Sequence, residues 1–351
     1  LARIGDQLPL SPRLQGAELV ILAGKRGNDG QQFLSLALDP LQQLPGTSAA
    51  LDNPIYRGKR LLYPLLAWLS GLGQAGLIPW TLGLLNVVSI GCCGALVARW
   101  AQLEQRSPQW GLAVLALPGY WITLSLDTAD LLATTLLLAS AVAFRQQRPS
   151  WLAASLAAAL LSRETGLLAW AASAWTSLRE RRWTWLLPLA LVPLPLLAWT
   201  ASLKARFPAT ADGLLVGLHF TWPGVGIATK ALQLLGLVSL PGPPVGTAER
   251  LFDSFCFGLW LLSLALLLGV AFRPCVNRWL RLTAGLYVLP ALCTSTQILA
   301  RFPDYTRVWI DLASLALIGL ISLRHKLAMG SWVVASTLIS IAYGVGYWQA
   351  P

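Results

Sequence analysis

Residues 77–98 read LIPWTLGLLNVVSIGCCGALVA, a long apolar run without one charged side chain. A helix needs about 20 mainly apolar residues to cross the hydrocarbon core of a bilayer, and this run is long enough. Further apolar runs follow it to the end of the chain. The 351 residues are 56% hydrophobic and only 12% charged, with a mean hydropathy of +0.60, outside the usual range of soluble domains. The composition therefore predicts a polytopic membrane protein.

The hydrophobic pattern predicts an all-α fold, a bundle of about ten transmembrane helices in a single integral-membrane domain over residues 1–351. The expected spans are residues 77–98, 110–125, 129–144, 151–161, 167–178, 183–201, 254–272, 282–299, 308–323 and 332–348. Residues 1–75 contain no run of that length, so we expect a first loop with short interfacial helices there. Residues 76–202 and 253–351 are expected to hold the spans, and residues 203–252 a second long loop carrying surface helices, within 213–220 and 229–240.

The orientation of the expected helices in the membrane follows from the loops that connect them, because short basic loops stay in the cytoplasm. Every second connector between the expected spans is rich in arginine and lysine. Together these connectors contain only two acids, Glu104 and Glu180. The basic residues concerned are Arg99, Arg106, Arg145, Arg148, Arg179, Arg181, Arg182, Arg273, Arg278, Arg281, Arg324 and Lys326. The opposite loops, which include residues 1–75, are thus expected outside the cytoplasm. A further span upstream of Leu1 would carry that segment across the membrane.

Several classes of site have no support in the sequence. The five cysteines show no C-x-x-C spacing, and the two histidines, His219 and His325, are far apart, so no metal site is predicted. The sequence contains no P-loop, no G-x-S-x-G and no H-E-x-x-H motif. The net charge of +11 comes from scattered residues that form no patch, which argues against nucleic-acid binding.

The segment 27–64 concentrates acids and bases in this apolar chain. Asp29 precedes an apolar-periodic run and has Gln32 three residues later, a pattern typical of a helix N-cap. The alternative is a general base that takes a proton from an acceptor hydroxyl. Asp39, a second carboxylate within one helix length, is the other candidate catalytic acid, whereas Asp52 in the turn Asp-Asn-Pro is interpreted as structural.

Other charged and aromatic residues lie at the same expected membrane face. Arg60, followed by Tyr63, is the best candidate for gripping a phosphate, with snorkelling to lipid headgroups as the alternative. Asp127 and Asp130 flank a tight turn, and adjacent Arg163 and Glu164 interrupt an apolar stretch, where unpaired charges are costly. Since neighbouring residues on a helix point apart, Arg163 and Glu164 require separate partners. Tyr305 and Arg307 come from a late outer segment. The residues expected to bind substrate are Arg60, Tyr63, Asp127, Arg163, Glu164, Tyr305 and Arg307.

Four short motifs, taken in their order along the chain, resemble those of a known family. Residues 29–33 read D-G-Q-Q-F, residues 51–68 read LDNPIYRGKRLLYPLLAW, residues 163–166 read R-E-T-G and residues 305–308 read Y-T-R-V. Together with the acidic hairpin at Asp127, this order resembles the bacterial integral-membrane glycosyltransferases of the GT-C superfamily, relatives of the polyprenyl-phosphate mannosyl- and arabinosyltransferases. The resemblance extends over residues 27–323.

The resemblance implies a function. It implies an inverting transfer of a sugar from a polyprenyl-phosphate donor to an extracytoplasmic acceptor, at a multi-pass protein of the bacterial inner membrane, with Asp29 as base. A paired acid directly beside Asp29 is absent. The expected partners are the lipid-linked sugar and membrane lipid, not nucleic acid; no cofactor is implied, and a divalent cation and the oligomeric state stay open. The alternatives are a multi-pass transporter or flippase, which would place charges near span centres, and a non-catalytic partner in envelope glycan assembly.

Overall fold

The protein is mainly helical in this computed structural model, which describes residues 4–14, 20–24, 27–208, 219–238 and 246–349. The strands of the described part are short: β1 (Ile4–Gly5) pairs in parallel with β2 (Ile21–Leu22), and an isolated bridge joins Phe220 to Thr294. A short 3-10 helix, η1 (Pro12–Leu14), lies between the two strands in sequence. The predicted all-α class is confirmed. The predicted surface helix at 213–220 falls largely outside the described residues.

The chain forms two compact units. The first comprises residues 1–92, 123–170 and 181–212, and the second comprises 93–122, 171–180 and 213–351. Three of the five dividing points lie within helices, namely α5 (Ile78–Leu103), α6 (Pro118–Leu126) and α9 (Gly166–Arg179). The expectation of a single integral-membrane domain stays a prediction.

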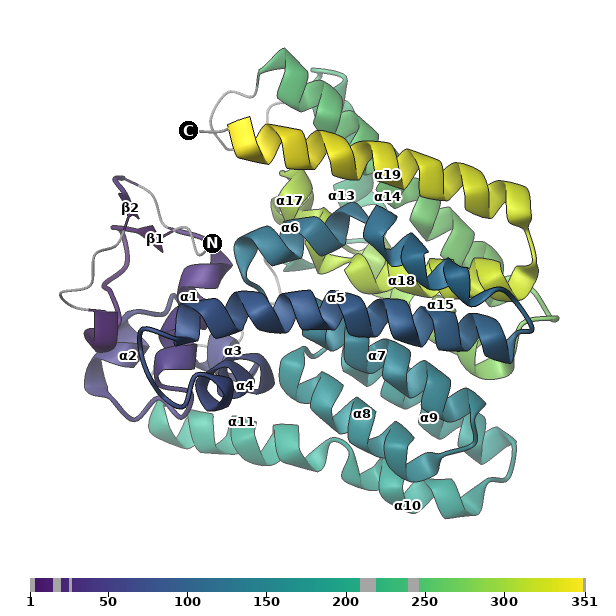
Figure 1. The fold of residues 1–351 in the computed structure, drawn as a ribbon, viewed down its shortest axis with the longest axis horizontal. Coiled ribbons are helices and arrows are strands. Elements are labelled where there is room, and N and C mark those ends of the chain that lie inside the picture. The colour runs from purple at the N-terminus through teal and green to yellow at the C-terminus, as the bar shows by residue number, and fades with distance from the viewer. Residues whose placement is uncertain (1–3, 15–19, 25–26, 209–218, 239–245, 350–351) are drawn as a thin grey trace. The chain divides into compact units, whose positions relative to one another are not determined.

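In the first unit, short helices from the first loop pack on longer ones. Besides parts of the shared helices, its helices are α1 (Asp29–Leu38), α2 (Pro45–Ala49), α3 (Pro54–Gly58), α4 (Leu62–Ser70), α7 (Asp130–Arg145), α8 (Pro149–Ser162), α10 (Trp183–Leu191) and α11 (Leu194–Arg206). Helix α1 packs against α4, and α7 packs against α8 (Figure 1). Every residue of α1 after Asp29 is buried. The ring of Phe33 meets that of Tyr63 edge-on, with centroids 5.5 Å apart.

The second unit is built around α14 (Thr247–Phe272), which packs on α15 (Arg278–Leu292), α18 (Ile310–Leu323) and α19 (Lys326–Gln349). The other elements are η2 (Pro108–Ala116), α13 (Val225–Leu234), α16 (Thr296–Leu299) and α17 (Phe302–Val308). Gly319 lets α18 approach α14 closely, because a Cβ there would lie 2.5 Å from Val270 Cγ2. Trp332 of α19 donates a hydrogen bond to Ser263 of α14 at 3.0 Å.

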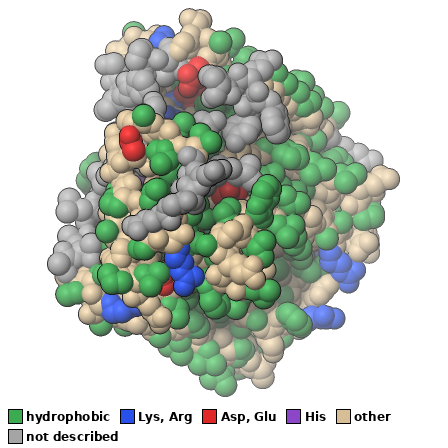
Figure 2. Space-filling model, turned by 60° about the vertical axis from the view of Figure 1, so that its left-hand side comes forward, with side chains coloured by type: hydrophobic (Ala, Val, Ile, Leu, Met, Phe, Trp, Pro, Cys, Tyr) green, Lys and Arg blue, Asp and Glu red, His purple; other side chains and the backbone are tan. Residues whose placement is uncertain are grey.

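Among the described residues, four continuous stretches are long and apolar enough to span a membrane: Ile78–Leu103, Trp183–Arg206, Thr247–Phe272 and Leu327–Gly346. A fifth would be the pair Phe302–Val308 and Ile310–Leu323, which bends by 52°. The polytopic helical architecture is therefore confirmed. Figure 2 shows a face on which hydrophobic side chains prevail and charged ones are few.

Five of the ten expected spans correspond to these stretches. The other five expected spans are shorter helices, among them α8 and α9 with 14 residues each. At 1.5 Å per residue, 14 residues reach about 21 Å, less than the ~30 Å hydrocarbon thickness. Turns with positive φ, at Asp127 and Gln147, follow the ends of α6 and α7, close to the expected ends at residues 125 and 144.

Candidate functional site

A buried arginine joins two carboxylates in the first unit. Arg57 Nη2 lies 2.9 Å from Asp29 Oδ1. The same guanidinium donates through Nε to Asp52 Oδ1 at 2.9 Å and through Nη2 to Asp52 Oδ2 at 2.8 Å. The side chains are 11% exposed for Arg57, 22% for Asp29 and 27% for Asp52. Arg57 thus holds two acids from different helical segments at the edge of solvent.

Electrostatics keep these groups charged. Burial alone would lower the pKa of Arg57, but the charges of Asp29 and Asp52 raise it well above its ordinary value. Burial would likewise raise the pKa of Asp52, yet the hydrogen bonds and charge of Arg57 outweigh it and leave the pKa below its ordinary value. Arg57 and Asp52 are therefore an ion pair that stays ionised at neutral pH.

The sequence LDNPIYR positions Arg57. Asn53 is the N-cap of α3 and accepts a hydrogen bond from Tyr56 N at 2.8 Å, and Pro54 takes the first helical position, where its missing N–H costs nothing. Arg57 then follows within one turn. The turn predicted from these residues is confirmed, but Asp52 also has a role that the pattern did not indicate, as the bidentate partner of Arg57.

The N-cap interpretation of Asp29 was wrong. Asn28 is the N-cap of α1 without a side-chain cap bond, and Asp29 is the first helical residue, with its carboxylate on Arg57. Gln32 does not complete a capping box with it: its Oε1 accepts from Asp52 N at 3.1 Å. Both side chains of the expected box therefore fasten α1 to the segment that carries Arg57.

Gly30 brings the start of α1 against the hairpin between α6 and α7. A Cβ on Gly30 would lie 2.2 Å from the carbonyl oxygen of Leu126 and 3.6 Å from Asp127 Cβ. Asp127 is 2% exposed, has φ +50°, and its Oδ1 has no hydrogen-bond partner among the described residues. Burial raises the pKa of Asp127 to about 6. The small residue in D-G-Q thus places Asp127 beside the helix that begins with Asp29.

Two more ion pairs of the first unit involve the sequence R-E-T-G. Arg163 Nη1 lies 3.0 Å from Asp130 Oδ1, with both side chains almost fully buried. Glu164 Oε2 lies 3.5 Å from Arg60 Nε. The expectation that these neighbours take separate partners is confirmed, because they lie in the break between α8 and α9 and face different segments.

Arg60 and Arg57 share an aromatic neighbour. Arg60 Nη2 donates to Tyr56 Oη at 2.8 Å, and the guanidinium carbons of Arg60 and Arg57 lie 4.9 Å and 5.3 Å from the centre of the Tyr56 ring. Arg60 Nε is buried and makes no hydrogen bond within the described part of the chain. Tyr56 therefore links the Asp29–Arg57–Asp52 group to the Arg60–Glu164 pair in one cluster, which we call the acid–base cluster.

Two candidate residues lie apart from the acid–base cluster. Asp39, at the far end of α1, accepts hydrogen bonds from Gln43 N, Leu44 N and Thr47 Oγ1 at 2.8–3.0 Å, so it caps the following turn. Tyr63 is fully buried and donates to Leu82 O at 3.0 Å. Their contacts favour structural roles, which makes Asp29 the better candidate for the base.

Tyr305 and Arg307 belong to the second unit and have partners there. Tyr305 donates to Asp253 Oδ1 at 2.8 Å, and the fully buried Lys230 pairs with the same carboxylate and donates to Ala300 O at 3.0 Å. Arg307 Nη2 lies 3.4 Å from Asp304 Oδ1. These contacts attach α13 to α14 and α17.

No protein-family model and no curated protein matches the chain. Among solved structures, the chain is similar to the crystal structure of ArnT from Cupriavidus metallidurans in the apo state. The sequence identity is 13% and the TM-score 0.37, with 84% of this chain and 72% of that chain covered. The resemblance to GT-C glycosyltransferases therefore rests on the short sequence motifs.

A metal site is not apparent in the part of the chain that the structure describes, where no three His, Cys, Asp or Glu side chains are grouped to hold an ion. Each acid of the acid–base cluster lies within ion-pair distance of an arginine.

The sequence indicated Arg60 as the best cation, whereas Arg57 is the one that contacts two carboxylates. Arg57 lies three residues after Pro54, which starts α3, and this spacing was the only signal for it in the sequence.

Proposed function

We propose that this protein is a GT-C-type membrane glycosyltransferase that moves a sugar from a polyprenyl-phosphate donor to an extracytoplasmic acceptor, with Asp29 as general base. The observation that carries the proposal is the position of Asp29. It is the first residue of a helix that is otherwise buried, its carboxylate is partly exposed, and Arg57 holds it at 2.9 Å. A base needs this combination of fixed position and access to a substrate.

The second support is the pairing of acids with arginines around it. Arg60 has a buried Nε without a hydrogen bond among the described residues, and a guanidinium binds phosphate oxygens well. Glu164 and Tyr56 hold this side chain from two sides. The acid–base cluster therefore offers a carboxylate for proton transfer and a positive group for a phosphate within the same unit.

The proposed reaction is a single inverting displacement. The acceptor hydroxyl oxygen attacks the anomeric carbon from the face opposite the phosphate, and its proton passes to Asp29. The bond between the anomeric carbon and the phosphate oxygen breaks, and polyprenyl phosphate leaves with both bonding electrons. Arg60 stabilises the negative charge that develops on the leaving phosphate. Asp127, beside the start of α1, is proposed to accept a hydrogen bond from a sugar hydroxyl.

The experiment that tests the proposal compares donors. Purified protein in liposomes is offered a sugar linked to polyprenyl phosphate or the same sugar as a nucleotide diphosphate, with envelope lipid extract as acceptor. We expect product only from the lipid-linked donor. Transfer from the nucleotide sugar without any lipid carrier would overturn the donor class.

The choice of sugars follows from comparing envelope glycans of cells with and without the gene. A glycan that loses one sugar in the deletion strain identifies the donor to synthesise. Unchanged glycans combined with altered movement of a lipid or solute across the membrane would favour the transporter alternative. Glycan loss that an Asp29→Asn variant fully restores would favour a non-catalytic partner.

A further inference from the structure

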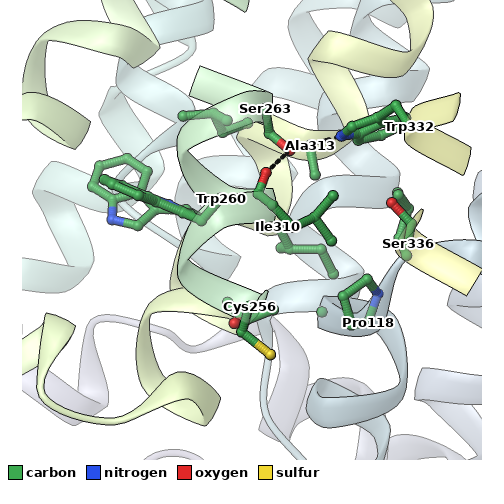
Figure 3. A pocket seen from close by; sticks show the side chains of 14 residues that line it. Pro118, Cys256, Trp260, Ser263, Ile310, Ala313, Trp332 and Ser336 are labelled. Atoms are coloured by element: carbon green, nitrogen blue, oxygen red, sulfur yellow. Dashed lines mark hydrogen bonds between the residues drawn. The ribbon is translucent and has the colours of Figure 1, made fainter. Parts of the chain in front are cut away.

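The cavity between α14, α18 and α19 in the second unit is too small for a sugar or a lipid. Its volume is about 30 Å³, which is room for one or two water molecules. Figure 3 shows Trp332 and Ser263 in its lining, where the ring nitrogen of Trp332 donates to Ser263 Oγ at 3.0 Å. The feature that indicates a further ligand lies instead on the surface of the first unit.

Two short connectors of the first unit come together where α8 and α10 begin. Residues 146–148 join α7 to α8, and residues 181–182 precede α10. Arg182 donates to Gln147 Oε1, and its guanidinium carbon lies 4.6 Å from the ring centre of Trp185 in α10 and 5.3 Å from that of Phe144 in α7. Helix α8 packs on both α7 and α10 (Figure 1). These contacts hold the two connectors side by side.

The surface at the two connectors is strongly basic. Arg145 ends α7, and the connectors contribute Arg148, Arg181 and Arg182, whereas the acid nearest to them in sequence is Glu180. We call these four arginines the arginine patch. Arg148 and Arg181 are exposed, and neither side chain makes an ion pair or a hydrogen bond within the described part of the chain. Like charges held close together repel one another, so binding of an anion at the arginine patch is favourable.

Exposed apolar side chains adjoin the arginine patch. Trp183 is the first residue of α10, and Leu187 and Leu191 follow it at intervals of four, so the three lie along one face of the helix. These three side chains and Trp151, in the first turn of α8, are all more than half exposed. A candidate membrane span begins at Trp183. Because tryptophan is enriched at the boundary of membrane and water, this position places the arginines at the level of the lipid headgroups.

We propose that the arginine patch binds the phosphate group of an anionic phospholipid, whose acyl chains lie along the stripe of Trp183, Leu187 and Leu191. A guanidinium is always charged and its fork of N–H groups matches phosphate oxygens. The apolar stripe beside the charges favours a molecule that is charged at one end and apolar at the other, over a soluble anion or an acidic protein segment. A zwitterionic lipid is less suitable, since its ammonium group is repelled by the arginines.

The first experiment separates the contribution of the headgroup charge from that of the acyl chains. Delipidated protein in an uncharged detergent is titrated with phosphatidylglycerol, with phosphatidylcholine of the same acyl chains, or with glycerol 3-phosphate. Binding is followed by the rise in unfolding temperature. We expect phosphatidylglycerol to act at concentrations at which the other two have no effect, and its effect to weaken as salt is added. The proposal is overturned if phosphatidylcholine or glycerol 3-phosphate is equally effective, or if phosphatidylglycerol has no effect at low salt.

Variants of the two exposed arginines locate the site. One arginine near a membrane surface changes the affinity for anionic lipid about fivefold, so Arg148→Gln combined with Arg181→Gln should weaken phosphatidylglycerol binding about 25-fold. Glutamine suits position 181, where φ is +54°, because Gln147 already adopts a φ of +60°. Without lipid, the double variant should unfold at the wild-type temperature, since both side chains are exposed and unpaired among the described residues.

A matched control removes the same charge elsewhere. Arg273→Gln combined with Arg278→Gln changes two exposed arginines at the connector between α14 and α15 of the second unit, where the neighbouring Trp279 is buried. We expect this control to change phosphatidylglycerol binding by less than about twofold, because the lost charges lie outside the arginine patch. Equal weakening in the two double variants would show a general attraction to net charge and would contradict the proposed site.

Discussion

Asp29 and Asp52 contact the same guanidinium, so their asparagine variants separate catalysis from stability. Asp29→Asn removes the negative charge from the ion pair with Arg57, at a carboxylate that is 22% exposed. Partly exposed pairs are worth about 1 kcal/mol or less. Asp52→Asn disrupts two charge-assisted hydrogen bonds, at 2.9 Å and 2.8 Å, to an arginine that is 11% exposed. Hydrogen bonds to charged groups contribute about 1.5–3 kcal/mol each, so we expect Asp52→Asn to cost about 2–3 kcal/mol.

The expected activities run in the opposite order. The amide that Asp29→Asn introduces cannot accept the proton, and loss of general-base assistance lowers rates by roughly 10²–10⁴-fold. Asp52→Asn leaves Asp29 and its contact with Arg57 in place, so the rate should fall less than about tenfold once stability is corrected. The more stable variant is thus expected to be the inactive one. This inversion is difficult to produce by misfolding.

The assay combines two measurements on each variant. Unfolding temperature is followed in detergent, and activity is read as restoration of the glycan profile in a deletion strain, together with sugar transfer in liposomes. Asp29→Asn protein that unfolds at the wild-type temperature and retains activity within tenfold would show that Asp29 is not the base. Equal activity losses in both variants would assign the effect to the placement of Arg57.

Three further predictions concern packing and charge. Gly30→Ala should destabilise the protein by about 1–3 kcal/mol, because its Cβ would meet a backbone carbonyl, whereas Gly91→Ala, with open space around it, should be neutral or slightly stabilising in thermal unfolding. Lys230→Met should cost about 3–5 kcal/mol by leaving Asp253 buried without its cation, and adding Asp253→Asn should recover part of that loss; a double variant less stable than Lys230→Met would contradict this. Burial raises the pKa of Asp127 to about 6, so the folded state binds this proton more tightly than the unfolded state. The stability that this group contributes therefore falls as the pH rises from about 4 to 6. In unfolding curves, Asp127→Asn should be more stable than the wild type at about pH 7.5 but not at about pH 4.

The helical class was predictable because apolar composition and run length depend on the sequence alone. The breaks near Asp127 and Gln147 were also predictable, since the structure has turns with positive φ where the sequence predicted a tight turn and a basic connector. The break at Arg163 was expected between residues 161 and 167, and what the sequence could not give is the partner of Arg163, whose guanidinium lies 3.0 Å from Asp130 Oδ1. That pairing depends on another part of the chain.

The sequence predicted which residues belong to the candidate site better than it predicted which of them pair with one another. Charges next to apolar segments must find partners, which identified Arg60, Arg163 and Glu164 before any geometry was known. The partners themselves depend on how segments meet. A helix-start pattern favoured Gln32 as a capping partner of Asp29, but the approach of α3 offered Gln32 a backbone amide and Asp29 a guanidinium. Tertiary contacts therefore replaced the local pairing.

Arg57, which contacts both Asp29 and Asp52, affects the basicity of Asp29. A carboxylate that is ion-paired to Arg57 is a weaker base than one standing alone, since the positive charge stabilises its ionised form. Asp52 counters this, because it engages Nε and Nη2 of the same guanidinium and places a second negative charge near Asp29. Removing Asp52 should then leave Arg57 to act on Asp29 alone and reduce the basicity of Asp29. The acidic limb of the pH–rate profile of Asp52→Asn should move to lower pH than in the wild type, whereas a profile that stays in place would show that Asp52 contributes only to folding.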